Sequence, residues 1–154
     1  MQQNFVPAHN SSPGMKYAIY TNIIVCLFIL LFSYAAVSKI LDYENFHIQL
    51  SSFPYLPDMI KYFAWLVPLS EFVIILFLIL PRYSLAGFYT AILLLIIFTV
   101  YLFMVLLFAP HIPCSCGGIL QQLSWKAHII FNSCWIMLGV TGMWLEKKHL
   151  KNEF

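Results

Sequence analysis

Charged residues are scarce in this sequence, and their scarcity excludes most classes of soluble protein. Only 9% of the 154 residues are charged, while 62% are hydrophobic. A soluble domain would carry about 25% charged residues. We therefore interpret the chain as an integral membrane protein with one compact domain. The formal net charge is only +2 and the basic residues are scattered, which argues against a nucleic-acid-binding surface.

Several long stretches contain almost no charge, and they predict an all-α, polytopic bundle of four transmembrane helices. A helix needs about 20 mainly apolar residues to cross a hydrocarbon core of about 30 Å. A loop with a short interfacial helix around Tyr43 to Phe53 is expected after the first span. We place the four spans at about residues 17–38, 62–80, 83–109 and 127–145.

Four spans place both chain ends on one side of the membrane, and the basic residues indicate which side. The side of the termini has five Lys or Arg residues and the opposite side has three. The positive-inside rule therefore predicts cytoplasmic termini in a bacterial inner membrane. The expected parts are residues 1–15 as a flexible cytoplasmic tail, residues 16–146 as the membrane domain and residues 147–154 as a basic cytoplasmic tail.

The sequence also lacks a Cys-x-x-Cys motif, and its closely spaced thiols are Cys114 and Cys116, between the third and fourth spans. Pro113 before them and two glycines after them favour a bent backbone. A disulfide across one residue is strained, which predicts a labile redox pair on the periplasmic side. Two alternatives remain: inert loop thiols, or a copper or zinc site with His111 and His128. Because Cys-x-Cys is a weak metal signal, we favour chemistry without a metal.

Glu71 lies inside the second predicted span, where a bare carboxylate is costly. It should be protonated, paired with a cation or exposed to a polar cavity. Lys39 at the end of the first span could reach it, and Ser38, Ser70 and His128 are other candidate partners. The pattern fits either a structural ion pair that fixes helix register or a site that handles protons beside a bound quinone or substrate.

His128 and Asn132 are four residues apart and should share one face of the fourth span. A histidine near the outer surface can accept a thiol proton near neutral pH. The alternative is that His128 contacts lipid headgroups and Asn132 joins helices. Cys26 reads as a small apolar filler, and Cys134 could meet a loop thiol only if the loop dipped inward.

Taken together, these residues resemble the DoxX-like group of membrane proteins, specifically its MauE branch. The run from Ser124 to Asn132 is similar to the form found in members from Bacteroidetes, and the resemblance covers roughly Ala18 to Trp144. The matching features in chain order are Ser38-Lys39, Glu71, Tyr101, Cys114-Ser115-Cys116-Gly117-Gly118 and Ser124-Trp125-Lys126-x-His128-x-x-Phe131-Asn132.

The resemblance implies a redox-associated four-helix protein of the inner membrane. MauE is needed for maturation of methylamine dehydrogenase, whose small subunit is rich in disulfides, which implies disulfide formation or transport of reducing equivalents. The architecture also resembles the vitamin K epoxide reductase and disulfide-oxidase bundles, which pass electrons from thiols to quinone. The Cys-x-Cys spacing departs from the Cys-x-x-Cys of those proteins and argues against quinone reduction.

The predicted function is that of a membrane thiol–disulfide redox protein, and thus a candidate oxidoreductase. Cys114 and Cys116 would exchange electrons with a periplasmic redox or client protein, while Glu71 and His128 assist proton movement. No cofactor is fixed by the residues, and a quinone is the candidate. The alternatives are a non-enzymatic accessory or assembly subunit of a larger membrane complex and, less favoured, a copper- or zinc-handling protein.

Overall fold

The structure is a computed structural model that describes residues 13–51, 60–108 and 125–153, and these residues are helical apart from short connections. The all-α prediction is therefore confirmed for the described chain. The elements are α1 (Pro13–Leu41), α2 (Tyr43–Ser51), α3 (Ile60–Ile79), the 3₁₀ turn η1 (Pro81–Tyr83), α4 (Ser84–Phe108) and α5 (Trp125–Glu153).

Three of the helices are long and apolar enough to cross a membrane. They provide the segments Lys16–Leu41, Pro81–Leu107 and Lys126–Lys151, and α3 adds a shorter apolar segment, Ala64–Ile79. The outer surface of the bundle is itself apolar, with side chains such as Leu30 exposed to 67% of their area. An apolar exterior of this extent suits lipid rather than water. The chain therefore has the features of a multi-pass membrane protein.

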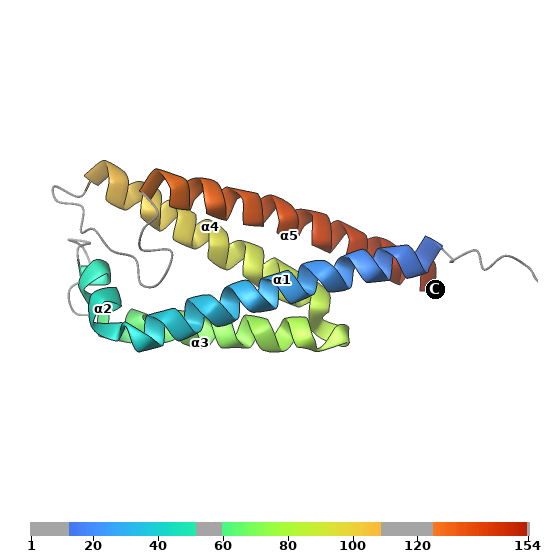
Figure 1. Cartoon of the computed structure of the whole chain (residues 1–154), viewed down its shortest axis with the longest axis horizontal. Coiled ribbons are helices and arrows are strands. Elements are labelled where there is room, and N and C mark those ends of the chain that lie inside the picture. The colour runs from blue at the N-terminus through green and yellow to red at the C-terminus, as the bar shows by residue number, and fades with distance from the viewer. Residues whose placement is uncertain (1–12, 52–59, 109–124, 154) are drawn as a thin grey trace, which may run out of the picture.

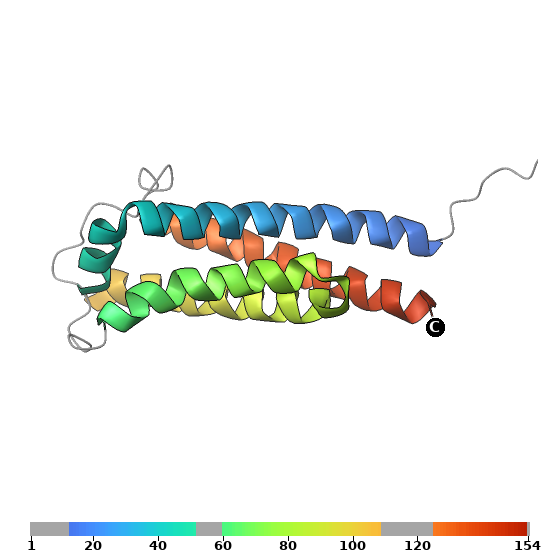
Figure 2. The same ribbon diagram turned by 90° about the horizontal axis from the view of Figure 1, so that it is seen from below.

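The four long helices form an antiparallel bundle in which each packs against its neighbours in the sequence (Figure 1). The principal contacts run from α1 to α3, α3 to α4, α4 to α5 and α5 back to α1. The start of α1, the turn η1 and the end of α5 lie at one end of the bundle, called the terminal end here (Figure 2). The helix α2, the end of α4 and the start of α5 lie at the opposite end, called the loop end.

Aromatic side chains fill the middle of the bundle. Phe28 and Phe88 are fully buried, and their rings meet edge to face at a centroid distance of 5.8 Å. Trp135 of α5 packs on Phe28 at 5.2 Å with an interplanar angle of 85°. Nearby, α5 comes so close to α4 that a Cβ atom at Gly142 would lie 2.6 Å from Phe88 Cε1. Glycine is therefore needed at this helix crossing.

A layer of buried polar residues lies about one helical turn from the crossing at Phe88 and Gly142, on the side of the terminal end. It consists of Thr21 on α1, Ser84 on α4 and Glu146 on α5, which expose only 2%, 5% and 7% of their areas. Within the described residues, the hydroxyl of Thr21 has no hydrogen-bond partner. The bundle therefore buries polar groups near its terminal end as well as near its loop end, where the candidate site lies.

The helices α1, α3 and α4 begin and end within four residues of the predicted spans, whereas α5 continues beyond the fourth predicted span, which ends at residue 145. The short helix α2 occupies the region where an interfacial helix was expected. The helix α5 continues to Glu153, so most of the basic segment predicted as a tail is helical. Residues 1–12, which make up most of the predicted N-terminal tail, lie outside the described residues.

Candidate functional site

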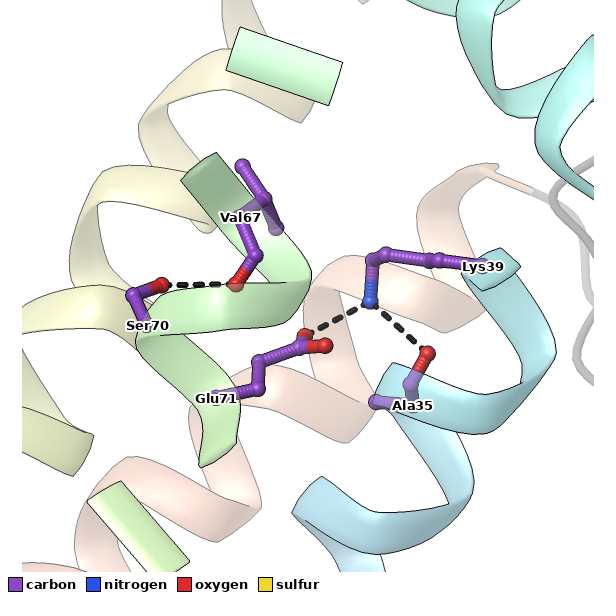
Figure 3. A network of polar contacts seen from close by, with 5 residues as sticks. All are labelled: Ala35, Lys39, Val67, Ser70 and Glu71. Atoms are coloured by element: carbon purple, nitrogen blue, oxygen red, sulfur yellow. Dashed lines mark hydrogen bonds and ion pairs between the residues drawn. The ribbon is translucent and has the colours of Figure 1, made fainter. Parts of the chain in front are cut away.

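An ion pair between Lys39 and Glu71 joins α1 to α3 near the loop end (Figure 3). Lys39 Nζ lies 2.7 Å from Glu71 Oε1, and the two side chains expose 17% and 5% of their areas. The same ammonium donates a longer hydrogen bond of 3.4 Å to the carbonyl oxygen of Ala35. Of the partners proposed for Glu71 from the sequence, Lys39 is thus the one that forms the pair.

The local sequence of α3 explains part of this arrangement. Pro68 lies inside the helix, three residues before Glu71, and it cannot donate the usual backbone hydrogen bond. That bond would have gone to the carbonyl oxygen of Ala64. Separately, the Ser70 hydroxyl donates to the carbonyl oxygen of Val67 at 2.7 Å. Ser70 is consequently engaged with its own helix, while Glu71 points toward α1, as Figure 3 shows.

Aromatic rings enclose the ammonium of Lys39. Its Nζ atom lies 5.9 Å from the ring centroid of Phe46 on α2 and 5.8 Å from that of Phe98 on α4. These distances allow cation–π attraction, which strengthens where water is excluded. The ring of Phe98 also packs against His128 of α5 at 5.6 Å and against Tyr101 at 6.1 Å. Side chains from α1, α2, α3, α4 and α5 therefore meet at this point.

His128 and Asn132 are both buried, at 7% and 3% exposure, and lie one turn apart on α5. His128 is close enough to Lys39 for the two groups to interact electrostatically. We call Lys39, Glu71, His128 and Asn132 the polar cluster. The prediction that His128 and Asn132 share one face is consistent with their joint burial.

Two atoms of the polar cluster lack hydrogen-bond partners within the described part of the chain. They are Glu71 Oε2, an acceptor, and Asn132 Nδ2, a donor. Buried polar atoms are nearly always hydrogen-bonded, so an unpaired acceptor and an unpaired donor on two helices of the same bundle each indicate capacity for a proton or a small polar ligand. The arrangement can thus hold a charge in the bundle and still offer one acceptor and one donor.

The predicted redox residues Cys114 and Cys116, and the alternative metal ligand His111, lie outside the described residues. Their segment connects the end of α4 to the start of α5, the two helices that carry Phe98 and His128. Cys26 and Cys134 are free thiols, and both are exposed on the outside of the bundle. The interpretation of Cys26 as a packing residue was therefore wrong, because the rotation of α1 turns this position outward.

Residues 13–51, 60–108 and 125–153 include no group of three side chains placed to hold a metal ion. His128 instead lies among Phe98, Phe131 and the Lys39 ammonium. A cation near the imidazole opposes the binding of a second cation there. The described surroundings of His128 therefore suit proton or ligand contacts better than a metal.

Sequence reasoning missed the two phenylalanines that enclose Lys39. Phe46 and Phe98 are indistinguishable in the sequence from the many other aromatic residues of these segments. The helices are apolar on all sides, so no periodic pattern identifies the inward face. The one available signal was a cation at the end of an apolar helix, which requires partners nearby.

Comparisons with known proteins give one match. The family model described as methylamine utilisation protein MauE matches residues 16–145, which include α3, α4, the polar cluster and most of α1 and α5. No curated protein and no solved structure matches the chain.

Proposed function

The chain belongs to the MauE family of methylamine utilisation proteins, and we propose that it is a membrane thiol–disulfide redox protein. In this proposal Cys114 and Cys116 are the exchanging thiols, and the polar cluster near the loop end handles protons. The DoxX-like relationship and the likeness to the Bacteroidetes form rest on the sequence motifs and belong to the same proposal.

The main support is the buried Lys39–Glu71 pair beside His128 at the loop end. An ion pair in an apolar bundle gains little stability over apolar side chains of similar size. Ionisable groups within membrane segments are accordingly associated with function. On α5, the buried ionisable residue nearest the loop is His128, three residues after the start of the helix.

The electrons and protons of the proposed exchange balance without a cofactor. A client dithiol attacks the Cys114–Cys116 disulfide; the client becomes a disulfide, and the two loop sulfur atoms receive two electrons and two protons. Attack requires a thiolate, so a nearby group has to accept each thiol proton and return it to the leaving sulfur. We assign this role to His128, with Glu71 holding the charge balance against Lys39.

Reoxidation of the loop needs an acceptor of two electrons and two protons. A periplasmic redox protein or a membrane quinone belongs to this class. The free atoms of the polar cluster fit a quinone: Asn132 Nδ2 could donate to a carbonyl oxygen, and Glu71 Oε2 could accept from a hydroxyl group. A bound quinone would supply the two-electron chemistry, while these residues would orient it.

The proposal includes four membrane crossings with the termini in the cytoplasm. The α3 helix has 20 residues and is thus about 30 Å long, enough to cross the hydrocarbon. Lys39 is paired inside the bundle and so should not be counted as a charge flanking the membrane. The count then becomes five basic residues at the terminal end against two at the loop end, Lys61 and Lys126, which favours cytoplasmic termini more strongly.

The oxidation state of the loop tests this function. Membranes are alkylated immediately on isolation, and the peptide containing Cys114 and Cys116 is analysed by mass spectrometry. We expect a disulfide in untreated cells, its loss in cells treated with reductant before alkylation, and its return in cells from which the reductant has been washed out before alkylation. Replacing Glu71 with Gln should slow its return, whereas replacing the exposed Glu44 of α2 with Gln should leave the rate unchanged. A loop that is never oxidised in cells would refute the proposal.

A second candidate is a non-enzymatic accessory subunit of a larger membrane complex. The observation in its favour is the same Lys39–Glu71 pair, interpreted as a device that fixes the register of α1 and α3. The double replacement of Cys114 and Cys116 by Ser separates the candidates. Full activity of the partner pathway in that variant would favour the accessory role.

A further inference from the structure

A pair of hydrogen-bond donors lies at the terminal end, away from the polar cluster. Lys147 Nζ of α5 donates to the phenolic oxygen of Tyr89 on α4 at 2.8 Å, and it lies 5.2 Å from the centroid of the same ring. Both side chains are exposed. They belong to two helices that pack against each other along the bundle.

This contact leaves donors available on both groups. The Tyr89 oxygen accepts from Lys147, so its own hydrogen is available to another acceptor. An ammonium has three N–H groups, and the bond to Tyr89 uses one of them. An ammonium and a phenol held 2.8 Å apart can converge on one anionic oxygen. Hydrogen bonds from a charged donor to such an oxygen are the strong ones.

The position of Lys147 along α5 indicates which kind of anion could bind there. From Lys126 to Lys147 there are 21 residues (147 − 126), which correspond to about 32 Å of helix and match a hydrocarbon core of about 30 Å. With Lys126 at one boundary of the membrane, Lys147 lies at the headgroup level of the other. The adjacent Lys148 is held 3.9 Å from the Trp144 ring, an aromatic residue of the type found at that level.

We propose that Tyr89 and Lys147 bind the phosphodiester group of an anionic phospholipid at the surface between α4 and α5. The acyl chains of the lipid would lie along the exposed apolar side chains that the two helices present to the bilayer. This site is independent of the redox proposal, because it lies at the opposite end of the bundle from the polar cluster.

Native mass spectrometry of the full-length protein, released from detergent with phosphatidylglycerol or phosphatidylcholine added, tests the site. We expect retention of phosphatidylglycerol over phosphatidylcholine. Lys147→Gln should weaken retention by about fivefold, the contribution of one basic residue near an anionic surface. Tyr89→Phe should weaken it too, because one donor is lost, while Lys147→Arg should retain the lipid. Lys126→Gln, on the same helix at the loop end, is the matched control and should behave as the wild type.

The proposal fails if both lipids are retained equally, or if Lys147→Gln and Lys126→Gln weaken retention equally. It also fails if millimolar inorganic phosphate displaces the lipid, since the site would then recognise free phosphate. Should Lys147→Gln not fold, Tyr89→Phe decides the matter, because it keeps the ring and removes only the hydroxyl group.

Discussion

Lys39 carries its charge into the bundle rather than to the membrane surface. A lysine at a helix end normally extends its ammonium toward water and headgroups. Here the ammonium contacts Glu71 and the rings of Phe46 and Phe98 instead. Because the carboxylate is almost completely buried, its charge depends on this one partner among the described residues.

Removing the ammonium alone should therefore be costly. We expect Lys39→Met to lower the free energy of unfolding by about 3 kcal/mol, because a buried carboxylate remains without its partner. The double variant Lys39→Met/Glu71→Gln should recover much of this loss, since no net charge is left unpaired. Thermal unfolding in detergent, arranged as a double-mutant cycle, measures the coupling. A double variant no more stable than the single one would contradict the expectation.

Asn132 allows the opposite prediction. Its Nδ2 atom is buried without a partner in the described residues, so the amide costs stability in the absence of a ligand. Asn132→Leu should raise the free energy of unfolding by about 1 kcal/mol in ligand-free detergent. Ser133→Ala, at the exposed neighbouring position, is the control and should have a small effect. A fall in stability for Asn132→Leu would mean that the amide already has a partner.

At the scale of elements, the sequence predicts where the helices lie better than which way they face. Long runs without charge identified the regions of α1, α3, α4 and α5, because only helices of that length suit a bilayer. Their rotations could not be inferred, since apolar residues surround each helix. Glu71 was an exception: a carboxylate has to face inward, and this requirement led to Lys39 as a candidate partner. The surroundings of Cys114 and Cys116 stay a prediction.

The close approach of α5 to α4 depends on Gly142. A methyl group there would lie 2.6 Å from Phe88 Cε1 and 2.9 Å from Ile24 Cγ2, too close for either contact. We expect Gly142→Ala to destabilise the bundle by about 1–3 kcal/mol through overpacking. The neighbouring exposed Thr141→Ala is the control. In the double variant Gly142→Ala/Phe88→Leu the smaller side chain should relieve part of the strain, and thermal unfolding would show the recovery.

At the scale of the whole molecule, the two ends of α5 should lie on opposite sides of the membrane. Single cysteines introduced at Lys126 and Lys147, in a background with the four native cysteines replaced by Ser, report this directly. In spheroplasts, which lack the outer membrane but have an intact inner membrane, an impermeant maleimide should label the cysteine at position 126. It should reach the cysteine at position 147 only after permeabilisation. Labelling in the reverse order would invert the topology and place Cys114 and Cys116 in the cytoplasm.

The apolar middle of the bundle has a consequence for energy coupling. Phe28, Ile74, Phe88 and Leu95 are buried together between the polar cluster and the layer of Thr21, Ser84 and Glu146. The apolar residues act as an electrical insulator, because a charge that crossed them would lose its solvation. In the proposed thiol–disulfide exchange, the protons should therefore come from the loop end and return to it, and the equilibrium of that exchange should be independent of the transmembrane voltage.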